Sequence, residues 1–256
     1  MESRVIVEVR DLALNYHTLA GETAALQNLS LQIKEGEFVS IIGPSGCGKS
    51  TLLSLICGLL QPSSGVVLVD GESVVGPNPK MGYMPQHDQL FPWRNIIQNV
   101  TLGLEVQHKL NEVTRTRAEK LLDKYGLGDF INHYPSQLSG GMRQRAALIR
   151  TLAVDPEILI LDEPFSALDY QTRLLVSDEV RKIIHNEKKT TILVTHDIAE
   201  GISMSDRIVV LTQRPAEIKN IHNIVLSCDE ISPIRKRECP EFRHYFNAIW
   251  KELDVK

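Results

Sequence analysis

A glycine-rich loop near the start of the chain constrains its fold more than any other feature. The loop follows residues 38–42, a mostly apolar run that predicts a buried strand, and precedes residues 50–60, which predict a helix. It fits the pattern G-x-x-x-x-G-K-[ST] and consists of Gly43, Pro44, Ser45, Gly46, Cys47, Gly48, Lys49, Ser50 and Thr51. A strand, this loop and a helix in that order indicate a phosphate-binding site.

The residues of this loop suit a nucleoside triphosphate. Glycines let consecutive backbone N–H groups point inward and form a nest for an anion. The following helix adds the positive end of its dipole. We expect Lys49 to reach the β and γ phosphates and the Ser50 hydroxyl to ligate Mg²⁺, whereas Cys47 fills a small-residue position without a redox role.

Composition limits the other classes of function. The chain has 256 residues, enough for one large domain or a domain with an inserted lobe, and its net charge of -4 argues against nucleic acid as the main partner. Its four cysteines show no C-x-x-C spacing, so we expect reduced thiols in a cytosolic compartment. No apolar run reaches the roughly 18 to 20 residues that span a bilayer. Any membrane role is therefore expected to come through a partner.

The order of predicted elements indicates the fold class. Strands are expected at 5–9 and 24–33, and the pattern from 93 to 154 is helical. After residue 155 strands and helices alternate, with strands at 157–161, 191–195 and 207–211 and a helix over 169–185. This order predicts an α/β core with a parallel sheet, into which a helical lobe is inserted.

Two acidic residues end the predicted strand at 157–161. Asp162 and Glu163 are expected at the C-terminal edge of the sheet, beside the phosphate loop, because nucleotides bind at that edge in open α/β sheets. We expect Asp162 to hold Mg²⁺ through water and Glu163 to polarise the attacking water.

A second glycine pair predicts a second phosphate-binding helix start. Ser139 is a good N-cap, and Gly140 and Gly141 expose the first N–H groups of the helix that follows. A single γ-phosphate needs only one such loop. The second start is therefore expected to serve a different nucleotide.

Together these motifs closely resemble the ATP-binding cassette family, whose signature is LSGGQ-like, although Met142 stands where Gln is common. The resemblance covers about residues 4–215 and implies a P-loop NTPase (RecA-like) core with an N-terminal antiparallel β subdomain and an inserted helical subdomain. It implies an ATPase that uses ATP and Mg²⁺. The single domain 1–256 would comprise a nucleotide-binding core (1–92 and 155–225), the helical insertion (93–154) and a C-terminal tail (226–256).

The resemblance also implies roles for individual residues. Tyr16 would stack on adenine, Gln86 would link the Mg²⁺ site to the helical lobe, and His196 would contact the γ-phosphate. The expected catalytic residues are Glu163, His196 and Gln86, and the expected metal-binding residues are Ser50, Gln86 and Asp162. Nucleotide binding is expected from the phosphate loop, Tyr16 and the residues that face a second subunit, namely Ser139, Gly140, Gly141 and Asp169.

The expected partners follow from the same resemblance. Two copies would bind ATP between them, head to tail, at the cytoplasmic face of a membrane. Integral-membrane permease subunits and, indirectly, an extracytoplasmic substrate-binding protein would complete a bacterial importer. The alternative is a non-transport ATPase of DNA repair or translation, but the chain lacks sustained heptads and carries one cassette. A binding module without catalysis conflicts with the intact Glu163 and His196.

Residues 84–94 and the tail resemble the nitrate, sulfonate and taurine importer group, so an anion or a thiamine precursor is the expected cargo. Phe91 and Trp93 either line a groove for the permease or pack within the helical lobe. The tail after Cys228 is either a regulatory or dimer-stabilising element or a solvated terminal helix, and we expect the second. Its deletion should then leave ATPase activity largely intact.

Overall fold

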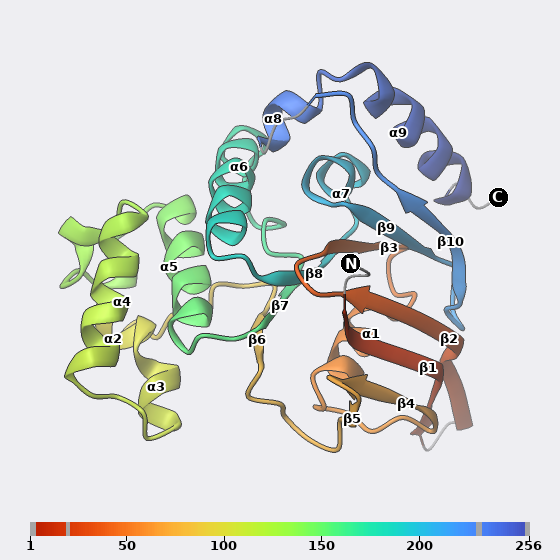
Figure 1. Cartoon of the computed structure of the whole chain (residues 1–256), viewed down its shortest axis with the longest axis horizontal. Coiled ribbons are helices and arrows are strands. Elements are labelled where there is room, and N and C mark those ends of the chain that lie inside the picture. Colours follow the sequence, from red (N-terminus) through yellow and green to blue (C-terminus); the bar gives the residue numbers. More distant parts are fainter. Residues whose placement is uncertain (1–3, 19–20, 229–231, 254–256) are drawn as a thin grey trace.

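The computed structural model describes residues 4–18, 21–228 and 232–253, which form two sheets and surrounding helices (Figure 1). The larger sheet has the order β10-β9-β3-β8-β7-β6. Its strands are β3 (Phe38–Ile42), β6 (Met81–Met84), β7 (Ile158–Asp162), β8 (Thr190–Thr195), β9 (Arg207–Leu211) and β10 (Ile218–Asn223). All neighbours pair in parallel except β10, which is antiparallel to β9. Every residue of β3, β7 and β8 is buried, as expected for parallel strands covered on both faces.

The smaller sheet is antiparallel and has the order β2-β1-β4-β5. It comprises β1 (Val5–Thr18), β2 (Gly21–Lys34), β4 (Ser64–Val69) and β5 (Glu72–Ser73). Helix α1 (Lys49–Ile56) lies between the two sheets, because its leucines share one buried cluster with side chains of both. This packing fixes the end of α1 that carries the phosphate loop.

A second group of helices covers the other side of β6 and β7 (Figure 1). It contains α2 (Ile96–Val100), α3 (Leu102–Val106), α4 (Glu112–Lys124) and α5 (Gly140–Ala153), joined by short 3₁₀ turns at Gly128–Phe130 and Pro135–Gln137. Asn111 caps α4, because its side chain accepts a hydrogen bond of 3.0 Å from the N–H of Thr114. The remaining helices are α6 (Tyr170–Asn186), α7 (Ile198–Met204), α8 (Pro233–Lys236) and α9 (Pro240–Leu253).

The α/β fold class is confirmed, but several elements differ from the sequence-based boundaries. Strands β1 and β2 are longer than predicted, since β1 continues through an irregularity near Asp11, whose φ is 46°. Such a bulge breaks the alternating pattern while the pairing goes on. Strands β6 and β10 and helix α7 were not predicted. Strand β6 and helix α7 are too short to show a clear period, and β10 is mostly polar and exposed.

The prediction of four reduced cysteines was wrong for one pair. Cys228 and Cys239 form a disulfide with a Cα–Cα distance of 6.0 Å, while Cys47 and Cys57 are free and buried. The chain turns back between β10 and α9 and brings the two positions together. Their separation of 11 residues carries no recognisable spacing, so only the fold reveals the contact.

The prediction of a solvated terminal helix was also wrong, because α9 packs on α7 and β9 (Figure 1). Ile249 of α9 is fully buried in a cluster with five side chains of the central sheet and α7, namely Ile42, Ile198, Ile202, Ile208 and Val210. The tail is therefore part of the folded core. Across residues 4–18, 21–228 and 232–253, we find no helix that combines the length and apolarity needed to cross a membrane.

The buried position of Ile249 predicts a stability effect. Ile249→Ala should lower the free energy of unfolding by about 3 kcal/mol, because it removes methyl groups and leaves a cavity. Urea denaturation followed by circular dichroism measures this change. Leu175→Ala is the matched control, since that side chain is 61% exposed and should change stability by less than about 0.5 kcal/mol. Equal effects of the two substitutions would contradict the docking of α9.

Candidate active site

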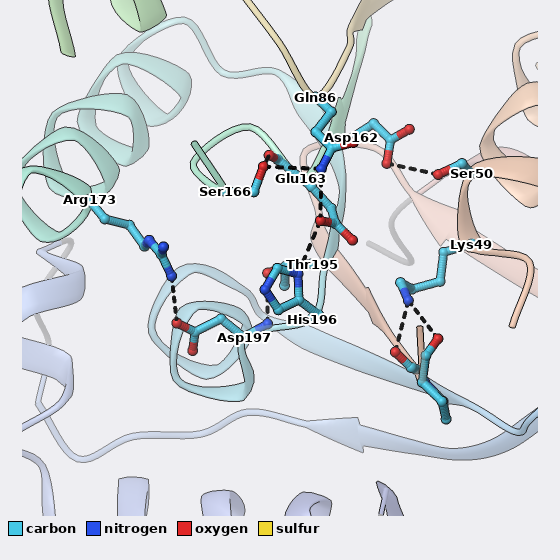
Figure 2. Close-up of polar contacts among 12 residues, drawn as sticks. Lys49, Ser50, Gln86, Asp162, Glu163, Ser166, Arg173, Thr195, His196 and Asp197 are labelled. Carbon is cyan, nitrogen blue, oxygen red and sulfur yellow. Dashed lines mark hydrogen bonds and ion pairs between the residues drawn. The ribbon is translucent and has the colours of Figure 1, made fainter. Parts of the chain in front are cut away.

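The candidate site lies where three parallel strands end at the same edge of the large sheet. The register places Ile42 of β3 opposite Thr195 of β8, and Asp162 of β7 opposite Val194 of β8. The residues that follow these strands are the phosphate loop, Glu163 and His196, and Figure 2 shows them around one space. The structure thus brings together most of the residues that the sequence singled out within one chain.

The phosphate loop has the backbone that its glycines predict. Gly46 and Gly48 have φ values of 74° and 121°, which disfavour other residues. A Cβ on Gly43 would come within 2.9 Å of the Cys47 sulfur. Lys49 is 6% exposed, and its Nζ donates to the carbonyl oxygens of Gly43 and Pro44 at 2.8 and 2.9 Å. The ammonium therefore lies inside the loop, where a phosphate would meet it.

The free thiol in this loop is buried and is disfavoured as a thiolate. Cys47 is 1% exposed, and burial raises the pKa of its thiol above the ordinary value. The reactive thiolate is thereby disfavoured. Cys47 therefore occupies a small, enclosed position in the loop.

Asp162 is held by two hydroxyl groups from other elements. It is 6% exposed, and its two carboxylate oxygens accept hydrogen bonds from Ser50 Oγ at 3.2 Å and Tyr83 Oη at 3.1 Å. Burial raises the pKa of Asp162, while the bonds from Tyr83 and Ser50 oppose that rise. Sequence reasoning assigned no role to Tyr83, because β6 was not recognised as a strand that ends beside β7.

Glu163 is the centre of a smaller polar network. Its Oε2 lies 3.0 Å from His196 Nδ1 and 3.4 Å from Gln86 Nε2, and Gln86 also reaches Ser166 Oγ at 3.3 Å (Figure 2). Glu163 itself has a φ of 46°, an unfavourable backbone conformation for a residue with a side chain. The fold therefore holds this carboxylate in place beside His196 against a local preference.

Tyr16 lies beside the first helix. Its hydroxyl is 3.1 Å from Thr51 Oγ1, its ring is 36% exposed, and the Arg214 guanidinium lies 6.0 Å from the ring centre. Arg214 also lines a cavity of about 220 Å³ that borders the phosphate loop from Pro44 to Cys47. The structure thus places an exposed aromatic face and a cation next to this loop, and sequence analysis did not anticipate Arg214.

Residues of the second glycine pair lie apart from the phosphate loop. Ser139 caps α5, and its side chain accepts from the N–H of Met142 at 3.3 Å, as predicted. Helix α5 packs beside edge strand β6 and helix α4, whereas α1 follows β3 in the middle of the sheet. Within the described segments, no hydrogen bond or ion pair joins Ser139, Gly140, Gly141 or Asp169 to the phosphate loop.

Two further charged residues contact Asp197, which directly follows His196. Arg173 of α6 is an ion-pair partner of Asp197, with 3.6 Å between Nη1 and Oδ2. Glu200 of α7 is 4% exposed, and its Oε1 has no hydrogen-bond partner. Burial, reinforced by the neighbouring Asp197, raises the pKa of Glu200 to about 8. Neither residue carries a motif in the sequence, since the contacts arise only when α6 and α7 pack together.

Comparison with known proteins identifies the family. A family model described as ABC transporter matches residues 26–166. The chain is 46% identical to an uncharacterised ABC transporter ATP-binding protein, YtlC of Bacillus subtilis (strain 168), over 93% of this chain and 92% of that protein. It is 41% identical to the nitrate import ATP-binding protein NrtD of Synechocystis sp. (strain ATCC 27184 / PCC 6803 / Kazusa), over 95% of this chain and 93% of that protein.

A solved structure has the same architecture. The dimeric post-hydrolysis state of the ATP-binding cassette MJ0796, bound to ADP and Pi, superposes with a TM-score of 0.73 at 33% identity and covers 86% of this chain and 99% of that one. The chain therefore belongs to the ABC transporter family. It is an ATPase with a P-loop NTPase fold, and the predicted resemblance to the nitrate importer group is confirmed.

The buried Glu200 carboxyl predicts a pH dependence of stability. Its pKa is raised from 4.5 to about 8 in the folded chain, so its stabilising contribution is complete below pH 4.5 and is lost as the pH rises through 8. Glu200→Gln cannot titrate. Between pH 5 and 8 the free energy of unfolding of the wild type should therefore fall relative to this variant by roughly 3–4 kcal/mol.

Urea denaturation at several pH values tests this prediction. Glu238→Gln is the control, because Glu238 is exposed and the change should leave the pH profile as in the wild type. A constant difference between wild type and Glu200→Gln from pH 5 to 8 would show that Glu200 does not hold its proton in the folded state.

Proposed function

We propose that two copies of this chain hydrolyse ATP between them and thereby energise a membrane importer. The observation that carries the proposal is that the residues expected to contact nucleotide lie at two separate places on one chain. Lys49, Asp162, Glu163 and His196 meet at one edge of the sheet, while the Ser139 helix start lies on a different part of the molecule. A second copy would supply the missing helix start.

Each residue around the phosphate loop has a proposed role that its surroundings support. The Lys49 ammonium and the N–H groups of the loop would bind the β and γ phosphates. Glu163 would accept a hydrogen bond from the attacking water, and His196, 56% exposed and beside it, would contact the γ-phosphate. Tyr16 would stack on adenine from its position next to Thr51.

The donor set at Asp162 fits Mg²⁺. A carboxylate and the Ser50 hydroxyl lie 3.2 Å apart, and such oxygen ligands are the ones that Mg²⁺ prefers. We propose that Ser50, Asp162 and Gln86 hold the ion. Bound Mg²⁺ supplies positive charge at the phosphate oxygens.

Helix α5 supports the dimer. Its N-terminus starts at Ser139 with Gly140 and Gly141, which have no side chains of their own beside the first N–H groups. Asp169 caps α6 in the neighbouring loop, where it would lie at the same interface. In a head-to-tail pair this helix end would face the γ-phosphate of the opposite subunit. The similarity to the dimeric MJ0796 cassette supports that arrangement.

A cleft beside edge strand β6 supports a membrane partner. It has a volume of about 610 Å³ and is lined by β6, α3 and α5, with Phe91 and Val106 among its residues. Phe91 stacks on Trp93 with ring centres 4.9 Å apart, and Trp93 is 70% exposed. We propose that a permease segment binds here and that Gln86, at the end of β6, connects the cleft to Glu163.

The proposed import function rests on the nitrate import ATP-binding protein among the relatives. The core (1–92 and 155–225) would bind nucleotide, the insertion 93–154 would face the permease, and the tail 226–256 would brace the core. The chain would work at the cytoplasmic face of the membrane, with a substrate-binding protein on the other side. We propose an anion such as nitrate as the cargo. No observation favours DNA repair or translation.

Substitution of the proposed base tests the hydrolytic site. Glu163→Gln should lower ATP turnover by about 100-fold or more, because the amide cannot accept a proton, while ATP binding is kept. A steady-state phosphate-release assay and gel filtration with ATP measure turnover and the trapped dimer. Glu112→Gln, at an exposed position of α4, is the control. Turnover of Glu163→Gln at the wild-type rate would refute the assignment.

Lys49→Ala tests whether the phosphate loop binds ATP. Loss of the ammonium should weaken ATP binding at least about tenfold, since charged hydrogen bonds to phosphate contribute roughly 1.5–3 kcal/mol. Equilibrium titration with a fluorescent ATP analogue measures the affinity. An unchanged affinity would remove Lys49 from the phosphate site.

Capture from membranes tests the partner. Tagged Glu163→Gln protein with ATP and Mg²⁺ should retain a multi-span permease from detergent-solubilised native membranes. Val106 is 70% exposed and lines the cleft, so Val106→Glu should reduce this capture. Val113 is 79% exposed and lies outside the cleft, so Val113→Glu should leave the capture unchanged. Recovery of ribosomes or repair factors without a membrane protein would overturn the transport role. Equal capture by both variants would exclude the cleft.

A further inference from the structure

One arginine links two loops of the site that are far apart in the sequence. Arg173 lies in the first turn of α6, and its Nη2 donates to the carbonyl oxygen of Leu168 at 3.1 Å. Its Nη1 lies 3.6 Å from Asp197 Oδ2, as Figure 2 shows. The side chain is 22% exposed, and its Nε is buried. The guanidinium therefore bridges the loop before α6 and the segment after β8.

Both residues that Arg173 contacts are close in sequence to residues of the polar network around Glu163. On one side, Leu168 belongs to the loop with Ser166, whose Oγ donates to the Glu163 carbonyl oxygen at 2.9 Å and also contacts Gln86. On the other side, Asp197 follows His196, whose Nδ1 is 3.0 Å from the Glu163 carboxylate. The contacts form a closed ring, in which Arg173 is the only member on a long helix.

The surroundings fix the orientation of this guanidinium. Asp197 caps α7, because its Oδ1 accepts the N–H of Glu200 at 3.1 Å, and its other oxygen remains for Arg173. Since α6 and α7 both anchor the bridge, movement of either loop meets resistance from the packed core.

We propose that Arg173 is a positioning residue for ATP hydrolysis, which holds the loop 166–169 and His196 in a fixed relation around Glu163. This inference rests on the proposed function, in which that loop faces a second subunit and His196 contacts the γ-phosphate. Closure of the dimer would press on the loop, and Arg173 would carry the displacement to Asp197 and His196. Correct placement of His196 would thus depend on the contact between subunits.

The chemistry of arginine suits this bridge. A planar guanidinium carries several N–H donors in a fixed fork and can serve a carbonyl and a carboxylate simultaneously. A lysine ammonium is a single point on a flexible stem. Arg173→Lys should keep the charge and lose the double contact, whereas Arg173→Met keeps the apolar stem and loses both.

Helix α6 offers a matched control. Arg181 lies eight positions further along, is 11% exposed, forms an ion pair of 3.7 Å with Asp206 and stacks over Phe38 at 4.8 Å. It contacts none of the residues in the ring around Glu163. Arg181→Met therefore removes a comparable buried cation of α6 without touching the site.

The experiment compares kcat and KM for ATP with the thermal midpoint in these variants. Arg173→Met should lower kcat about tenfold, equivalent to 1.4 kcal/mol in the barrier, with KM and ATP affinity within about twofold of wild type. Arg173→Lys should lower kcat less, about threefold. Arg181→Met should lower the thermal midpoint as much as Arg173→Met and leave kcat within about twofold of wild type.

A double-mutant cycle identifies the route of the effect. Asp197→Asn keeps the cap of α7 and removes the charge that Arg173 contacts. If the two residues act through one contact, the double variant Arg173→Met with Asp197→Asn should lose no more kcat than the stronger single variant. If the kcat loss of the double variant equals the product of the two single losses, the two residues act independently and the bridge is contradicted.

The outcomes separate this inference from the proposed function. Wild-type kcat in Arg173→Met, or equal losses of kcat in Arg173→Met and Arg181→Met, would overturn the positioning role while Glu163→Gln stays inactive. Turnover by Glu163→Gln would instead overturn the proposed site. If Arg173→Met does not fold, Arg173→Lys decides, because a wild-type kcat in that variant refutes the bridge.

Discussion

Parallel pairing of β3, β7 and β8 is the constraint on which the rest of the site depends. Parallel strands all end at the same edge, so the segments that follow them meet there although they are distant in sequence. The three strands are completely buried, and helices on both faces prevent them from shifting. A slip of one residue would carry Asp162 away from Ser50 and turn every side chain of the strand to the opposite face of the sheet.

The site contains an unfavourable backbone conformation and buried carboxyl groups, and the packing of the surrounding elements must compensate for their cost. Glu163 has a left-handed backbone, and Asp162 and Glu200 are carboxyl groups whose pKa is raised by burial. Each is unfavourable by itself. The compensating contacts come from other elements, with Tyr83 on β6 holding Asp162 and His196 after β8 contacting Glu163. Such cross-element support explains why a hydrolytic site needs the whole domain and not the phosphate loop alone.

One chain carries two separate helix starts, at Lys49 and at Ser139, on different parts of the fold, and we propose that both bind phosphate. The proposed dimer gives each start a nucleotide, and ATP then becomes part of the interface. Tail helix α9 supports the same core through Ile249, which shares a buried cluster with Ile42, the residue directly before the phosphate loop. Stability of the tail and geometry of the loop are therefore physically connected.

The sequence by itself determined the phosphate loop, the cap at Ser139 and the acidic pair after β7, because each depends on neighbours within a few residues. It also predicted the α/β class from the alternation of apolar segments. Tertiary structure alone decided the Cys228–Cys239 disulfide, the docking of α9 and the contacts of Tyr83, Arg173 and Glu200. These contacts join segments that only the packed sheet brings together, so no local pattern records them.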